Sequence, residues 1–188
     1  MSHDQGYKLA SLEGNTLLQE AHEIRHTHIN LDEAVCKESV ENLNQVLVDT
    51  IMLRDLYKKH HWQLSGITFY QLHLLFDEHY EQQKDLVDNI AERVQLLGGI
   101  SIGMPKDVAE KTKITTPPIG REDPAVQITR LIEAHKTILG YCHDYAEQAS
   151  SSGDHRTEDL LVSEVIMTNE KQVWFLAEHL VPMDLQGK

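Results

Sequence analysis

Two pairs of side chains that could bind a metal ion recur in one stretch of the sequence. His73 and Asp77 are four residues apart, and so are Asp88 and Glu92. In an α-helix, residues at this spacing lie on one face, a single turn apart. Asp77 and Asp88 are eleven residues apart, which at ~100° per residue returns to nearly the same side of the helix. Imidazole and carboxylate groups displayed together could hold a divalent cation.

The two pairs cannot form one site within a single helix. Their midpoints are fifteen residues apart, or roughly 22 Å at about 1.5 Å per residue. A second, antiparallel copy of the helix removes this difficulty, because the first pair of one chain then faces the second pair of the other. Two-fold symmetry gives two such sites, as expected of a homodimer. His61, at the end of the preceding helix, would complete each site.

The ligand set indicates which metal would bind. Two imidazoles and three carboxylates suit Fe²⁺, with Mn²⁺ or Zn²⁺ as competitors, and the absence of thiolate argues against a structural zinc. A plainer interpretation also fits the spacing. Acidic residues at helical intervals commonly form a solvated face, and a chain with twelve histidines can contain a His/Asp pair by chance.

The apolar periodicity predicts an all-α protein that would position these side chains. Residues 100–122 contain three of the five prolines, so we expect a long connection with a short helix at 106–112. Four amphipathic helices with one long crossover between the second and third are typical of the ferritin-like four-helix bundle. No strand is expected. The predicted long helices cover residues 31–60 and 67–97, a third that begins near Asp123 and Pro124, and a fourth that follows a turn at 150–154 and ends before Pro182.

The same pattern divides the chain into one domain and two tails. We predict a flexible tail at residues 1–30, a bundle at 31–181 and a short tail at 182–188. In the fourth helix, the residues expected to face the core are Val162, Ile166, Val173, Leu176 and Leu180.

Composition indicates a soluble protein of the cytoplasm. Of the 188 residues, 40% are hydrophobic and 25% are charged, and no apolar run approaches the ~20 residues of a membrane-spanning helix. The amino terminus has neither the basic start nor the apolar stretch of a secretory signal. Cys36 and Cys142 fall in apolar helical stripes, so we predict two buried thiols.

The charge distribution argues against nucleic-acid binding. The formal net charge is −13, and neither tail is a cationic arm. Residues 1–30 contain Lys8 and Arg25 against four acidic residues, and the last seven residues hold Asp184 and Lys188. Phosphate contacts require clustered Lys or Arg, so DNA binding is not expected, whereas an acidic shell attracts cations.

A longer motif is more specific than the spacing alone. The run HHWQLSGITFYQLHLLFDEHYEQQKDLVDNIAERVQLLGG resembles the signature of the Dps family, the twelve-subunit mini-ferritins, over about forty contiguous residues. The family's five ferroxidase positions fall on residues of the matching type, and the helix layout extends the resemblance from about residue 31 to 180. The matched residues are His61, His73, Asp77, Asp88 and Glu92.

The resemblance implies a hollow homododecamer. Its subunits would oxidise Fe²⁺ with peroxide or dioxygen at two-fold interfaces and deposit ferric mineral inside, because anionic ligands stabilise Fe³⁺ more than Fe²⁺. Trp62 would lie near the site, either as a packed aromatic or as a group that quenches radicals. Two other functions stay open: a DNA-compacting protein, and a shell that sequesters zinc without turnover.

The resemblance also indicates accessory positions. Asp154 and Asp159 match acidic residues that line the family's three-fold pores and would draw in Fe²⁺. Asp154 or Thr157 could also cap the fourth helix, and both roles can hold together. His79 and His155 differ from the commoner family residues and could be extra ligands. His79 is two residues from Asp77, about 200° around the helix, so we expect it to be exposed instead.

Overall fold

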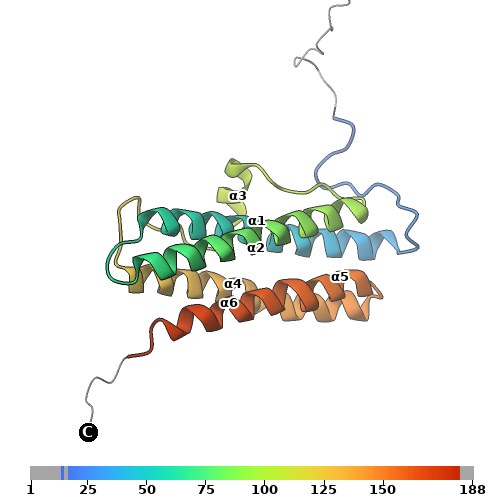
Figure 1. Cartoon of the computed structure of the whole chain (residues 1–188). Helices are drawn as coiled ribbons and strands as arrows, with labels where there is room; N and C mark the ends of the chain where they lie inside the picture. Colours follow the sequence, from blue (N-terminus) through green and yellow to red (C-terminus); the bar gives the residue numbers. More distant parts are fainter. Residues whose placement is uncertain (1–13, 15–16, 183–188) are drawn as a thin grey trace, which may run out of the picture.

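The protein is described by a computed structural model that covers residue 14 and residues 17–182. Two antiparallel helix pairs form two layers (Figure 1). The first layer contains α1 and α2, and α1 also packs against α4 of the second layer. A rod of three helical segments, α5, η1 and α6, lies beside α4. The elements are α1 (Glu33–Gln63), α2 (Phe69–Leu96), α3 (Pro105–Lys111), α4 (Pro124–Ser151), α5 (His155–Asp159), the π-helix η1 (Leu160–Ile166) and α6 (Met167–Glu178).

Glycine ends α2 where the amino-terminal segment crosses it. Gly98 has φ +83°, a left-handed conformation that commonly terminates a helix. The backbone N–H of Arg25 donates to the Gly98 carbonyl at 2.9 Å. A Cβ atom at position 98 would collide with the backbone carbonyl of Arg25. The glycine therefore permits both the turn and the close approach of the segment that precedes α1.

A buried carboxylate attaches the crossover to the bundle. Asp49 of α1 is fully buried and accepts hydrogen bonds from Thr112 Oγ1 and the Lys113 backbone N–H, both at 2.7 Å. Gln45 and Tyr141 also donate to this carboxylate, each at 2.8 Å. A buried charge is stable only when such donors replace water. Asp49 thus fixes the end of α3, which packs outside the α1–α2 layer (Figure 1).

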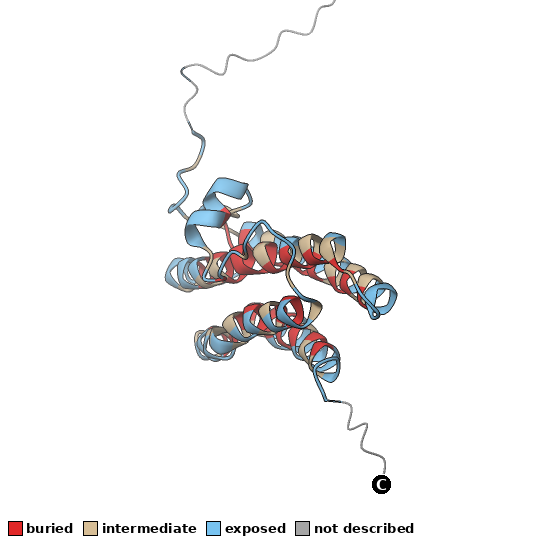
Figure 2. Ribbon diagram, turned by 90° about the vertical axis from the view of Figure 1, so that its left-hand side faces the viewer, coloured by how far each residue is buried: buried red, intermediate tan, exposed pale blue. Residues whose placement is uncertain are grey.

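The core lies between the two layers, where the buried residues face one another (Figure 2). Each buried Leu or Ile contributes about 1.5–3 kcal/mol relative to an exposed side chain. Cys36 and Cys142 are buried as predicted, and burial raises the pKa of the Cys142 thiol to about 12. Among the largest fully buried side chains are Leu43, Leu53, Tyr57, Phe76, Ile90, Leu131, Ile138, Leu161 and Leu176.

The all-α bundle and its long crossover are confirmed, and no strand occurs among the described residues. The expected core face of the fourth helix was partly wrong. Val162 is 47% exposed, and Leu180 lies beyond the end of α6. The π-helical segment shifts the register of this rod, and two positions of its buried face are polar, so the apolar pattern was misleading.

Of the predicted amino-terminal tail, the structure describes residue 14 and residues 17–30. Residues 183–188 lie beyond the described part, and the predicted flexibility of residues 1–30 stays a prediction. Ile24, in the amino-terminal segment, packs partly buried against the core. Across the described ranges, no helix is both long and apolar enough to cross a membrane.

Candidate metal centre

The end of α1 and the start of α2 bring three predicted ligands together. The imidazole rings of His61 and His73 stack with their centroids 3.6 Å apart and an interplanar angle of 20°. Nδ1 of His61 lies 3.9 Å from Oδ1 of Asp77. Phe69 also stacks on His73, with ring centroids 5.0 Å apart. These side chains are partly exposed, so the cluster opens to the surface of the chain.

Backbone contacts fix the tautomer of both histidines. Nδ1 of His61 lies 2.8 Å from the carbonyl oxygen of His73, and Nδ1 of His73 lies 3.1 Å from the carbonyl oxygen of His61. A carbonyl oxygen can only accept, so each Nδ1 carries the proton and donates. In the neutral imidazole, Nε2 then has a lone pair free for a metal ion, and this hydrogen bond to the other ring nitrogen is typical of metal-binding histidines.

A lysine forms a salt bridge with the carboxylate of this cluster. Lys58 Nζ donates to Oδ1 of Asp77 at 2.5 Å, and it also lies 4.4 Å above the ring of Tyr80. The hydrogen bond from Lys58 lowers the pKa of Asp77. The carboxylate is therefore ionised and is paired with the ammonium group of Lys58.

The other two predicted ligands lie further along α2. Asp88 and Glu92 are exposed on the uninterrupted helix, roughly 22 Å along its axis from the first pair. His61, His73 and Asp77 lie near one another, but within the described part of one chain no three or more His, Cys, Asp or Glu side chains are arranged so that they could hold a metal ion. One chain thus brings His61, His73 and Asp77 together and leaves the second pair apart.

Two of the accessory residues differ in their surroundings. Trp62, the residue after His61, is 69% exposed. His79 was expected to be exposed, and this expectation was wrong, because its exposed fraction is 3%. His79 lies on the side of α2 that faces the core. The other buried residues of this helix include Leu72, Phe76, Gln83, Leu86 and Ile90.

Sequence reasoning missed a set of buried polar residues in the bundle. His135 of α4 and Asn169 of α6 are fully buried and hydrogen-bonded to each other at 2.6 Å. His60 is also buried, and neither of its ring nitrogens has a partner among the described residues. The sequence does contain a signal that His135 is buried. It lies seven residues from both Ile128 and Cys142, on the same apolar stripe of the helix.

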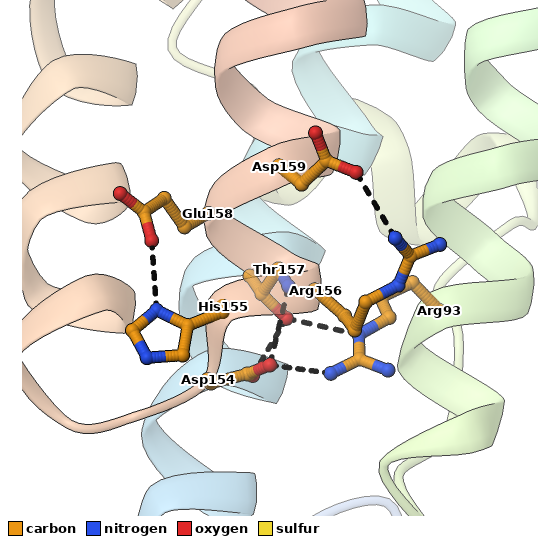
Figure 3. Close-up of polar contacts among 7 residues, drawn as sticks. All are labelled: Arg93, Asp154, His155, Arg156, Thr157, Glu158 and Asp159. Carbon is orange, nitrogen blue, oxygen red and sulfur yellow. Dashed lines mark hydrogen bonds and ion pairs between the residues drawn. The ribbon is translucent and has the colours of Figure 1, made fainter.

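The predicted pore residues lie at the two ends of α5, with Asp154 as its N-cap and Asp159 as its last residue (Figure 3). The Asp154 carboxylate is 1% exposed, pairs with Arg93 of α2, and accepts from the Thr157 backbone N–H at 3.1 Å and from Thr157 Oγ1 at 2.6 Å. Burial alone would raise the pKa of Asp154, but these hydrogen bonds and the Arg93 charge hold it below its usual value. This geometry matches the predicted helix cap.

The exposed side of the same segment carries weaker pairs. Arg156 contacts Asp159 at 3.1 Å, and His155 contacts Glu158 at 3.0 Å (Figure 3). The hydrogen bond from His155 lowers the pKa of Glu158. Asp159 therefore faces solvent and could meet arriving cations, whereas Asp154 cannot. The pore role of both residues stays a prediction.

Known proteins resemble this chain in both sequence and fold. Residues 40–185 match the model of the ferritin-like domain. The solved structure of DpsC from Streptomyces coelicolor is 48% identical, covers 92% of this chain and 100% of that chain, and superposes with a TM-score of 0.89. A nutrient stress-induced DNA-binding protein from Nostoc sp. is 30% identical over 88% of this chain and 89% of its own length.

A third relative connects the fold to metal chemistry. The Dps protein of Vibrio cholerae, described as a member of a broad superfamily of ferritin-like diiron-carboxylate proteins, is 25% identical. It covers 87% of this chain and 99% of its own, with a TM-score of 0.76. The family match spans most of the chain and the similarity extends over whole solved subunits. The chain therefore belongs to the Dps family of ferritin-like proteins.

Proposed function

We propose that the protein is a ferroxidase and iron-storage mini-ferritin that protects the cell against oxidative damage. Membership of the Dps family supports iron storage and stress protection in general. The observation that carries the finer proposal is the arrangement of His61, His73 and Asp77. Both histidines keep Nε2 free beside an ionised carboxylate, and this set is incomplete without ligands from elsewhere.

The missing ligands come from a second chain in this proposal. When two α2 helices run antiparallel across a two-fold axis, Asp88 and Glu92 of one chain reach His61, His73 and Asp77 of the other. The resulting site combines two imidazole nitrogens with three carboxylates. Binding of Fe²⁺ displaces Lys58 from Asp77, and the anionic ligands then favour the loss of an electron to peroxide or dioxygen. Twelve chains would enclose the ferric mineral.

Two other functions, DNA binding and zinc sequestration, can be tested with the same purified protein. The Nostoc relative is named as a DNA-binding protein, but the net charge of −13 here gives DNA phosphates little to bind. A gel shift at low salt that retards DNA at micromolar protein would reinstate that function. Zinc can compete for the nitrogen-and-oxygen site, and the metal content of the purified protein measures how much of it does so.

Stopped-flow mixing of the purified protein with Fe²⁺ and peroxide under anaerobic conditions tests the ferroxidase proposal. Ferric absorbance should develop much faster with protein than in buffer. Asp77→Ala should reduce the rate to about the buffer value, because it removes a carboxylate that stabilises Fe³⁺. Glu78→Ala is the matched control, since Glu78 is a neighbouring acidic residue on a different face of α2. Equal rates for wild type and buffer, or for wild type and Asp77→Ala, would refute the proposal.

A further inference from the structure

The interior of the bundle contains a network of buried polar side chains. All six members are at most 3% exposed, and they come from α1, α2, α4 and α6. We call them the interior polar network. Groups removed from water at this depth are stable only when they bond to each other. The network comprises Tyr57, His79, Gln83, His135, Asn169 and Gln172.

The hydrogen bonds determine where the protons of this network lie. Asn169 Nδ2 donates to the carbonyl oxygen of Val165 at 2.7 Å, so Oδ1 of Asn169 points at Nδ1 of His135, 2.6 Å away. That oxygen can only accept, so Nδ1 of His135 carries a proton and its Nε2 does not. Tyr57 OH lies 2.6 Å from this bare Nε2 and therefore donates to it. His79 Nδ1, 3.1 Å from the phenol oxygen, is then a donor.

The π-helical segment supports this arrangement. Val165 belongs to η1, and its carbonyl accepts the side chain of Asn169 in the following turn. π-helical turns are rare and occur frequently at functional sites. Gln83 of α2 also donates to Asn169, at 3.4 Å, and to Gln172, at 3.0 Å. The orientation of Asn169, and through it the tautomer of His135, is thus held from two helices.

Tyr57 lies next to the candidate metal centre. It precedes His61 by four residues on α1, a spacing that places Cβ atoms about 5–6 Å apart. Its ring packs edge-on against Phe76, the residue before Asp77, with centroids 5.9 Å apart. A buried phenol that donates to a neutral imidazole, one helical turn from His61 and in contact with the residue that precedes Asp77, is placed to exchange an electron with the centre.

We propose that Tyr57 donates one electron when a single Fe²⁺ at the centre meets hydrogen peroxide, and that His135 accepts the phenol proton. This inference rests on the proposed ferroxidase function. Peroxide accepts two electrons and two solvent protons, its O–O bond breaks, and two water molecules leave. Fe²⁺ supplies one electron and becomes Fe³⁺. Tyr57 supplies the other and becomes a neutral phenoxyl radical, while its proton moves to Nε2 of His135.

The step avoids a damaging alternative. With one electron available, peroxide splits into hydroxide and a hydroxyl radical, which attacks the protein. A second electron from Tyr57 completes the reduction to water. A later Fe²⁺ can return the electron, and the proton then moves back from His135 to the phenol oxygen. Burial supports the starting state, because it raises the pKa of Tyr57 and lowers that of His135 to about 4, so both groups begin neutral.

The interior polar network could instead serve solely to fix the packing of the four helices. That role predicts no radical, so electron paramagnetic resonance separates the two. Anaerobic protein loaded with no more than one Fe²⁺ per centre is mixed with peroxide and frozen within the turnover time. We expect a tyrosyl signal that narrows when the protein contains ring-deuterated tyrosine. A signal from exposed Trp62 would not narrow.

Variants then assign the signal to one residue. Tyr57→Phe should abolish it, whereas the matched control Tyr80→Phe, which removes a nearby phenol that packs against Lys58, should retain it. His135→Gln keeps a hydrogen-bonding group but cannot accept the proton, so the radical yield should fall several-fold while Tyr57 is intact. This variant and the labelled wild type preserve the test if Tyr57→Phe does not fold.

Each outcome has a defined meaning. Normal ferric absorbance without a tyrosyl signal, or with a signal that persists in Tyr57→Phe, overturns the inference and leaves the ferroxidase proposal intact. No protein-dependent ferric absorbance in the wild type overturns both. A signal that disappears in Tyr57→Phe and weakens in His135→Gln supports the assignment of donor and proton acceptor.

Discussion

The candidate metal centre and the interior polar network both use histidine side chains, but their ring nitrogens are bonded differently. At the surface, His61 and His73 each bond to a carbonyl through Nδ1 and leave Nε2 open. In the interior, both ring nitrogens of His135 are bonded, to Tyr57 and Asn169. The capacity to bind an ion depends on which atoms remain open, and residue type alone does not decide it.

Position on the helix produces this difference. Asp77 and His79 are two residues apart on α2, yet the first is at the surface cluster and the second is bonded to Tyr57 in the core. Surface groups can be completed by another chain, whereas interior groups must be completed within their own. The contrast therefore predicts that the metal centre needs a partner and the network does not.

The sharpest test of this contrast mixes two inactive chains. One carries His61→Ala and Asp77→Ala, and the other carries Asp88→Ala and Glu92→Ala. Each alone should show no ferroxidase activity. After dissociation and reassembly in equal amounts, half of the dimers contain one chain of each kind, and each has one intact site of two. About a quarter of the wild-type rate should return, which stopped-flow absorbance measures.

The control is the same mixture without dissociation, which should stay inactive. A site formed within one chain would give no recovery under either condition. Recovery well above about a quarter of the wild-type rate would mean that the ligands of the two chains combine in some other way.

The sequence predicted the bundle because its signals are local. Helical periodicity, the glycines after α2 and the prolines of the crossover each constrain the backbone without reference to distant residues. The relative placement of the candidate ligands was predictable for a related reason. Residues four apart on one helix must share a face, so the spacing of Asp88 and Glu92 was sufficient to place them relative to each other.

The interior polar network was not predictable from local patterns. A histidine on a helix gives no indication of whether an amide on another helix, 34 residues away in the case of His135 and Asn169, will satisfy it. Polar residues in the core also interrupt the apolar stripe, and the π turn of η1 shifts its register, so Val162 was assigned to the wrong side. Likewise, the pairing of Asp154 with Arg93 depends on a contact between α5 and α2 that spacing does not show.

Acid should lower the free energy of unfolding through His135, because the pKa of this residue is lower in the folded chain than in the unfolded chain. Burial lowers this pKa from 6.5 to about 4 in the folded chain. The unfolded chain binds more protons between these values, so the stabilising contribution is complete above about pH 6.5 and is lost as the pH falls toward 4. This group alone accounts for about 3 kcal/mol at most. Denaturant unfolding at pH 7 and pH 4.5, at fixed protein concentration, measures the loss.

The variant His135→Gln isolates this group. His60 and His79 are also buried, with pKa values lowered to about 4 and about 3, but they are present in both proteins and cancel in the comparison. Between pH 7 and pH 4.5, we expect the variant to lose less free energy of unfolding than the wild type. This holds even if the variant is less stable than the wild type at pH 7. Equal losses would show that His135 is not protonated on unfolding.

The smallest expected effects concern the two carboxylates of the α5 segment, the exposed Asp159 and the buried Asp154. Asp154→Asn removes the charge paired with Arg93 and weakens the cap on Thr157, so it should cost about 1–2 kcal/mol in the free energy of unfolding. Asp159→Asn breaks an exposed pair with Arg156 and should change stability by no more than about 0.5 kcal/mol. It should instead slow Fe²⁺ uptake about two-fold at low salt, because one attracting charge is lost.

Salt provides the control for this last comparison. Screening shortens the reach of an exposed carboxylate, so the uptake difference between wild type and Asp159→Asn should shrink at high ionic strength. The stability difference of Asp154→Asn should persist, because that carboxylate is 1% exposed and its partners exclude solvent. Thermal melts and initial uptake rates at two salt concentrations measure both quantities. Uptake that depends on Asp154 and is indifferent to Asp159 would reverse the roles assigned to the exposed and the buried carboxylate at this end of the bundle.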